Sequence, residues 1–122
     1  MRASPRRVRQ DKITLFTPID KEFDVTYQTT FVDYVRVDEN YGINQSAKGI
    51  EDTNSVLVVI DLNDLQAYGA EPVKDLMPLL IKGRTLVRLE HTDDLQNAFT
   101  LNDIKKDKPA DNKPAFLELL LR

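Results

Sequence analysis

The clearest structural pattern in this sequence lies in residues 23–37, which read FDVTYQTTFVDYVRV. Polar side chains hold most of the even positions, and the odd positions carry Phe23, Val25, Tyr27, Phe31, Val35 and Val37. This period of two predicts a β-strand with one buried face. Val, Tyr, Phe and Thr dominate the segment, and these residues suit a pleated, half-buried surface.

A second segment, residues 55–62 (SVLVVIDL), has apolar side chains at both even and odd positions. A strand that is apolar on both faces lies inside a sheet or under another layer. We therefore expect residues 55–62 to form a central strand of the same sheet.

The other expected elements are short. Residues 12–17, 85–90, 95–104 and 116–122 are interpreted as strands, with Pro18 ending the first and residues 19–22 forming a tight connection. Residues 38–54 read as a loop that can include a short strand around Ile43, and residues 105–114 read as a mobile loop. A helical turn is expected within residues 61–72, capped by Asp61 or Asn63 and closed by Gly69, and a short helix or 3₁₀ turn is expected before Pro78.

These elements predict a mainly β protein, a small antiparallel barrel or sandwich of about six or seven strands with at most one short helix. At 122 residues and 14.0 kDa the chain is long enough for one domain. We expect a flexible basic N-terminal arm over residues 1–11 and a single β-rich domain over residues 12–122. The arm and Lys12 hold five basic residues against one acid, a charge of +4, so the rest of a chain with net charge −3 carries −7.

Composition narrows the function classes. The chain has no cysteine, which removes disulfides, thiolate metal sites and a cysteine nucleophile. No apolar run approaches the roughly 18 residues that cross a bilayer, and no apolar segment follows the N-terminal arginines as in a secretory signal. We expect a protein made in the cytoplasm that has no membrane partner.

Few residues suggest chemistry. His91 lies in EHTDD beside three acids, but one histidine in an acidic turn more often belongs to the surface than to a metal site. Asp61 and Asp64 could supply paired carboxylates for acid–base work, and helix capping explains them equally well. The segment Lys82–Arg84 lacks the Gly-rich run of a phosphate-binding loop and reads as a hairpin turn. We expect no catalytic residues, no metal and no cofactor.

Association with other proteins is better supported by the residue pattern. An arm rich in arginine can become ordered against an acidic surface of a neighbouring subunit. The final segment FLELLLR is a strand or helical turn that is apolar on all sides. It is either an ordinary buried strand that closes the sheet or a strand that contributes one face to its own core and the other to a neighbour. The predicted assembly residues are Arg6, Arg7 and Arg9 in the arm, Lys105, Lys106 and Lys108 in the loop, and Phe116, Leu119 and Leu120 at the end.

The order of segments resembles a known family. ITLF at residues 13–16, DVTYQTTFVDYVRVDENYG at 24–42 and KGIEDTNSVLVVIDL at 48–62 are similar to the small minor capsid, or head-completion, proteins of tailed bacteriophages of Gram-positive hosts. IKGR at residues 81–84, FTLNDIKKDKP at 99–109 and FLELLLR at 116–122 resemble the later segments of that family.

The resemblance implies a β-rich connector subunit that forms a ring at the head–tail junction of the virion. Its implied partners are copies of itself, the portal or an adaptor, and a tail-completion or tail-terminator protein, with packaged DNA in the channel. Two other readings remain open: a tail-terminator protein that caps the tail tube, and a small β-barrel module that binds nucleic acid or carbohydrate.

Overall fold

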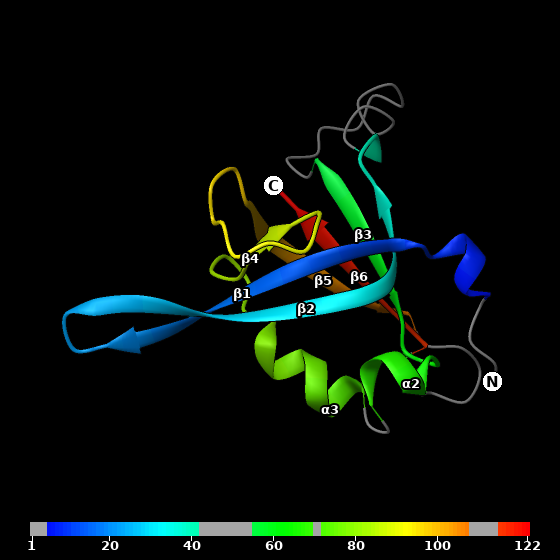
Figure 1. Cartoon of the computed structure of the whole chain (residues 1–122), viewed down its shortest axis with the longest axis horizontal. Coiled ribbons are helices and arrows are strands. Elements are labelled where there is room, and N and C mark those ends of the chain that lie inside the picture. The colour runs from blue at the N-terminus through cyan, green and yellow to red at the C-terminus, as the bar shows by residue number, and fades with distance from the viewer. Residues whose placement is uncertain (1–4, 42–54, 70–71, 108–114) are drawn as a thin grey trace.

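The computed structural model describes residues 5–41, 55–69, 72–107 and 115–122. These residues contain six strands that form one closed antiparallel barrel (Figure 1). The strands are β1 (Asp11–Lys21), β2 (Asp24–Asp38), β3 (Val56–Asp61), β4 (Leu86–Arg88), β5 (Phe99–Asp107) and β6 (Phe116–Leu121). The mainly β prediction is confirmed, and the closed sheet makes the protein a barrel.

The barrel consists of two three-stranded meanders joined along both sides. Strands β1, β2 and β3 are consecutive neighbours, as are β4, β5 and β6, and the pairs β3–β6 and β1–β4 close the sheet. β3 and β6 pair over their whole length, from Val56 opposite Leu121 to Asp61 opposite Phe116. Their interior side chains are fully buried, which explains why both segments are so apolar.

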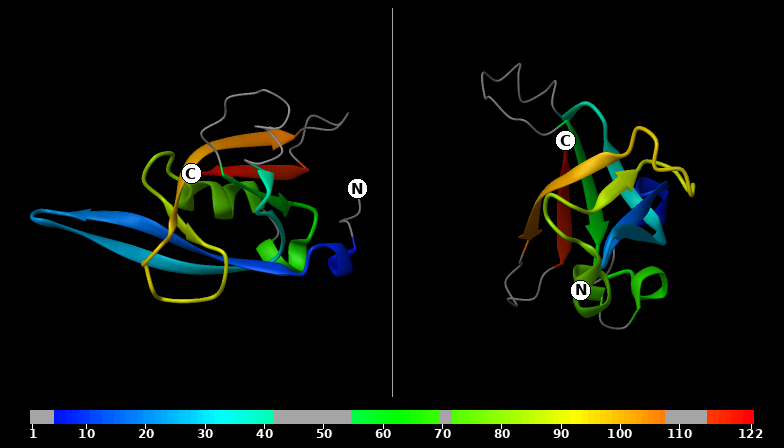
Figure 2. Two further views of the ribbon diagram at one scale, coloured as in Figure 1. Left: turned by 90° about the horizontal axis from the view of Figure 1, so that it is seen from above. Right: turned by 90° about the vertical axis from the view of Figure 1, so that its left-hand side faces the viewer.

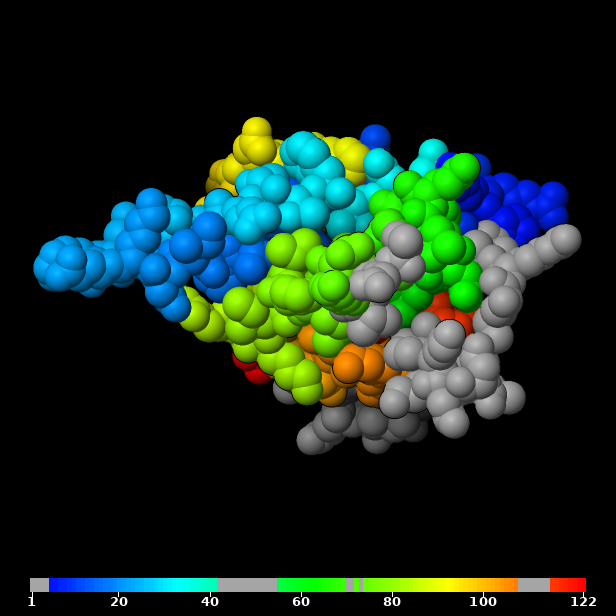
Figure 3. Space-filling view, turned by 90° about the horizontal axis from the view of Figure 1, so that it is seen from below, coloured from blue at the N-terminus to red at the C-terminus, as the bar shows by residue number. Residues whose placement is uncertain are grey.

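Short helices cover one side of the barrel, where Figure 3 shows them packed against the body. They are α2 (Leu65–Tyr68), α3 (Pro72–Leu76) and the 3₁₀ turn η2 (Met77–Leu79). The described part thus holds two short α-helices rather than at most one. Asp64, not Asp61 or Asn63, caps α2 by accepting a hydrogen bond from the Ala67 amide, and Gly69 closes it as expected.

Pro18 does not end the first strand. β1 continues through Pro18 to Lys21, and Pro18 pairs with Tyr27 of β2. The β4 ladder reaches β1 only from Thr14 to Phe16, so beyond that point β1 has one neighbouring strand and tolerates a residue without an amide hydrogen. The expected tight connection over residues 19–22 is therefore wrong, and the turn lies at Glu22 and Phe23.

The buried face predicted for residues 23–37 is also only partly correct. Asp11 pairs with Val35 and Ile13 with Val32, so β2 advances three residues while β1 advances two. This bulge includes Tyr34, whose φ of +57° lies in the left-handed region. It changes which parity faces inward: Val32 and Val35 are buried, whereas Phe31 is 52% exposed.

The later strands differ mainly in length. β4 is shorter than residues 85–90, and β5 begins at Phe99 and extends to Asp107, so Lys105 and Lys106 lie on a strand rather than in a loop. The possible strand around Ile43 lies outside the described residues, as does Lys108. In the described part of the chain, none of the helices is long and apolar enough to span a bilayer.

Candidate functional site

A two-stranded hairpin projects from the barrel. It is formed by residues 17–28, where β1 and β2 pair only with each other. Thr17 and Pro18 are buried at its base, and beyond them the hairpin extends well away from the body (Figures 1 and 2). We call residues 17–28 the projecting hairpin. Phe23 at its turn is 94% exposed, and the neighbouring exposed apolar side chains are Ile19, Val25 and Tyr27. Such a concentration of apolar side chains on a protrusion is typical of a surface that contacts another molecule.

The tip of the projecting hairpin is acidic. Phe23 stands between Glu22 and Asp24, and Asp20 lies on the adjoining strand. Asp20 accepts two hydrogen bonds from the Arg84 guanidinium, at 2.9 and 2.5 Å, and these bonds lower the pKa of the Asp20 carboxyl. Arg84 already compensates Asp20, and Lys21 pairs with Asp24 across the hairpin. With one cation at Lys21 against two anions at Glu22 and Asp24, the tip keeps a net charge of −1.

Next to the hairpin, His91 stacks on an exposed aromatic ring of β2. The ring centroids of His91 and Phe31 are 4.8 Å apart. Nε2 of His91 lies 3.1 Å from the Asp33 carboxylate without completing a hydrogen bond. His91 therefore belongs to a surface cluster, consistent with its interpretation as part of a surface turn.

At the opposite end of the molecule, the N-terminal segment is attached to the body by arginines. Nε and Nη2 of Arg6 donate hydrogen bonds to the Asp64 carboxylate, each at 2.9 Å, and Arg9 donates another at 3.1 Å. Arg9 is only 4% exposed, and its guanidinium is 3.9 Å from Asp61. Arg6 and Arg9 thus attach residues 5–11 to their own chain, although most of the other side chains of this segment are exposed, in contrast to the free arm that the sequence predicted. The acidic partner expected on a neighbouring subunit lies in the same chain.

The β2 bulge is bound by the same network of side chains. The Tyr34 carbonyl oxygen accepts hydrogen bonds from Nη1 of Arg9 at 2.8 Å and from the Tyr68 hydroxyl at 2.7 Å. The guanidinium carbon of Arg6 lies 3.8 Å from the centre of the Tyr34 ring, a cation–π contact. Burial raises the pKa of the Tyr68 hydroxyl, so it remains a donor at neutral pH. The bulge is therefore held from both the N-terminal segment and α2.

A pocket of about 300 Å³ opens beside this network. It is lined by Val8, Arg9, Arg36, Val59, Asp61 and Phe116. Val8, Val59 and Phe116 supply an apolar surface, and Arg36 is exposed at its edge. Its size is at the lower end of ligand pockets, roughly 300–1,000 Å³, which suits one side chain better than a whole ligand.

The predicted assembly residues are distributed unevenly. Leu119 is fully buried and Leu120 is 3% exposed, so neither offers a surface, whereas Phe116 is half-buried and lines the pocket. Arg7 is exposed on the 3₁₀ turn η1 (Arg6–Val8), and Lys105 and Lys106 are exposed on β5. Of the predicted residues that the structure describes, Arg9 and Phe116 line the pocket together, whereas Lys105 and Lys106 are not part of its lining.

The same outer face of the barrel carries an acidic pair. Burial and a hydrogen bond with Asp107 raise the pKa of the Glu118 carboxyl. Glu118 pairs with Val59 of β3 and with Lys105 of β5, so it lies one strand away from the pocket residues of β3. This pair places two carboxyl groups in contact between β5 and β6.

The residues considered for chemistry have structural contacts. Asp64 caps α2 and binds two arginines, and Asp61 is 1% exposed beside Arg9 and accepts from the Asn63 amide. Within the ranges that the structure describes, no group of three or more His, Asp or Glu side chains is arranged to hold a metal ion.

The hairpin tip was not predicted from the sequence. Phe23 was expected on a buried strand face, yet it is the most exposed of the large apolar side chains described. The available signal was the cluster of charged residues at Asp20, Lys21, Glu22 and Asp24, because Asp, Glu and Lys are depleted in strands.

Comparison of the chain with family models, with curated proteins and with solved structures yields no match.

Proposed function

We propose that this protein is a structural subunit of a tailed-phage virion, a head-completion or connector protein that forms a ring between the portal and the tail. The observation that supports this best is the projecting hairpin, which presents Phe23 at 94% exposure far from its own core. An isolated apolar side chain on a protrusion gains free energy only when another molecule covers it. The phage setting comes from the resemblance of the strand sequences.

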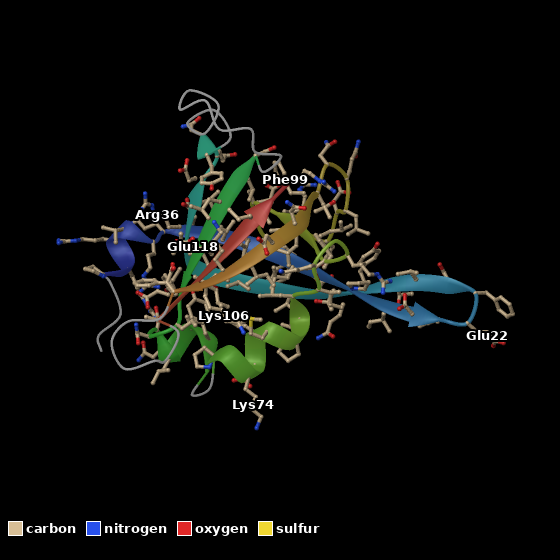
Figure 4. All side chains as sticks on the ribbon, turned by 180° about the vertical axis from the view of Figure 1, so that it is seen from behind. Glu22, Arg36, Lys74, Phe99, Lys106 and Glu118 are labelled. Atoms are coloured by element: carbon tan, nitrogen blue, oxygen red, sulfur yellow. The ribbon has the colours of Figure 1, made fainter. Side chains whose placement is uncertain are left out.

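The arrangement of the two ends favours a ring. A ring of identical subunits uses two different surfaces of each subunit, one facing each neighbour. The projecting hairpin and the pocket beside Arg9 are two such surfaces, and they lie at opposite ends of the molecule (Figure 4). The acidic hairpin also argues against nucleic acid as its partner, because phosphates would be repelled by Glu22 and Asp24.

Immunogold labelling of virions of the phage whose genome encodes this chain tests the proposal. We expect label at the neck between head and tail. Absence of the protein from purified virions, or label spread along the tail shaft, would contradict it.

The same experiment separates the two phage roles. Mutants that make heads without tails should carry the protein if it completes the head, whereas free tails should carry it if it is a tail terminator. Sedimentation of the purified protein, alone and with isolated capsids, then measures whether copies associate before or only after the portal is offered.

A further inference from the structure

The tip of the projecting hairpin has the chemistry of an insertion element. Phe23 is almost fully exposed in the turn, and Glu22 and Asp24 flank it. Lys21 lies opposite Asp24, so the tip combines one aromatic ring with a net charge of −1, and Glu22 is its acid without a cross-strand cation. The turn is carried on two paired strands, from Pro18 opposite Tyr27 to Lys21 opposite Asp24, which hold it away from the body. A membrane is a poor partner, because anionic lipid headgroups would repel both carboxylates.

The pocket at the other end has the complementary chemistry. Its apolar lining comes from Val8, Val59 and Phe116, and its charged groups are Arg9, Arg36 and Asp61. Two cations against one anion leave it with a charge of +1, and the 3.9 Å contact of Asp61 with Arg9 compensates that anion locally. Arg36 projects at the exposed edge, where an incoming carboxylate would meet it.

The two elements cannot meet within one chain. Figure 4 shows Glu22 at the end of the projecting hairpin and Arg36 at the opposite end of the molecule, with the whole barrel between them. A contact between them joins two copies head to tail. Because it uses different surfaces on each copy, it leaves a free hairpin and a free pocket at the ends of every chain of copies until the chain closes.

We propose that the pocket lined by Val8, Val59 and Phe116 receives Phe23 from a second copy of this protein, with Glu22 and Asp24 of that copy paired to Arg36. This inference rests on the proposed function in that it names the surfaces through which ring subunits meet. Insertion removes the Phe23 ring from water in an apolar site and places charges of opposite sign at its edge. The fit of charge sets the orientation of the hairpin, and the ring supplies the anchor.

Complementation between two variants of the full chain tests the contact. Phe23→Ala removes the tip and keeps the pocket, whereas Arg36→Glu keeps the tip and places a repelling charge at the pocket. Both residues are exposed, so both variants should fold, which circular dichroism and thermal unfolding will verify. Leu95→Ala, which shortens an exposed apolar side chain in the loop between β4 and β5, is the matched control.

In sedimentation velocity we expect wild type and Leu95→Ala to form the same oligomers. The association constants of Phe23→Ala and Arg36→Glu should each fall by at least about thirtyfold, which is the loss typical of removing an aromatic anchor from an interface. Mixing the two variants should give a dimer of one copy each that grows no further, because only one tip and one pocket remain intact.

Three results would overturn the inference. Oligomers of both variants that match wild type would show that copies meet elsewhere, and the proposed ring would stand. Folded variants that stay separate on mixing would show that tip and pocket do not bind each other. Wild-type protein that remains monomeric at every accessible concentration, and does not assemble on isolated capsids either, would rule out the contact, while virion labelling decides the proposed function independently.

Discussion

The guanidinium of Arg9 lies 3.1 Å from the carboxylate of Asp64, across 55 positions of sequence, and both side chains are buried. This ion pair attaches the N-terminal segment to the loop that begins α2. Asp64 also binds Arg6 and caps α2, so one carboxylate joins the N-terminal segment, through two arginines, to the start of α2. We infer that Asp64 organises the end of the barrel where the pocket opens.

Replacement of Asp64 should be costly. Asp64→Ala leaves Arg9 buried without its closest carboxylate and removes the cap of α2, and we expect the free energy of unfolding to fall by about 3 kcal/mol. Urea unfolding measures this. The control is Asp93→Ala in an exposed loop, which should change stability by less than about 0.5 kcal/mol. A loss at Asp64 as small as at Asp93 would show that the network adds nothing to stability.

The free energy of unfolding should also depend on pH through the titration of Asp64. Its arginine partners, Arg6 first, lower the pKa of the carboxyl from 3.8 to about 2. A pKa lowered by folding stabilises the protein above the unfolded value, and this contribution is lost as the pH falls from about 4 to about 2. It amounts to roughly 2 kcal/mol. The difference in unfolding free energy between wild type and Asp64→Asn should therefore be constant from pH 7 to pH 5 and shrink below pH 4; a constant difference down to pH 2 would contradict the shift.

The projecting hairpin should contribute little to the stability of a single copy. Because Phe23 is almost fully exposed, Phe23→Ala should change the unfolding free energy by less than about 0.5 kcal/mol. Leu117→Ala, at a fully buried position of β6, should cost about 2–5 kcal/mol. Chemical unfolding at a concentration where the protein is monomeric makes the comparison, and an equal loss in both variants would mean that Phe23 packs against its own chain.

Gly69 should not accept a side chain. Its φ of +86° and ψ of +169° belong to a region used almost only by glycine, and a Cβ there would lie 2.7 Å from the Asp75 carboxylate. We expect Gly69→Ala to destabilise the protein by about 1–3 kcal/mol in thermal unfolding. Gly83 also has a positive φ, but a Cβ there would meet open space, so Gly83→Ala should destabilise the protein less than Gly69→Ala. A larger loss of stability in Gly83→Ala would show that the contact with Asp75 is not the source of the strain.

Much of the barrel was predictable because its central strands have simple patterns. β3 and β6 are apolar on both faces and were assigned from that property alone, and the turn at Gly83 was expected from Lys82–Arg84. The paths of the chain beyond these strands were harder to predict. Whether Pro18 ends a strand depends on the number of neighbouring strands at that point, and this number is a property of the assembled sheet.

The candidate site was less predictable than the fold, for physical reasons that particular residues illustrate. The bulge at Tyr34 changes the inward parity of β2, and its stabilising contacts with Arg9 and Tyr68 come from distant segments. The arginines of the N-terminal segment were predicted to bind an acidic surface of a neighbouring subunit, and the sequence could not show that Asp64 of the same chain would bind them. Of the apolar C-terminal residues, only Phe116 lines the pocket. The sequence could not show this, because the exposure of the outer face of a strand depends on which other segments cover it.

The charges of the projecting hairpin oppose its pairing with further strands. A two-stranded ribbon offers unpaired backbone amides and carbonyls to an extended peptide that approaches it. Pro18, buried at the base of the hairpin, has no amide to offer there, and beyond it Asp20, Lys21 and Asp24 place charged side chains along both strands. Such an edge disfavours backbone pairing with another chain, so contacts of the hairpin are favoured through its side chains.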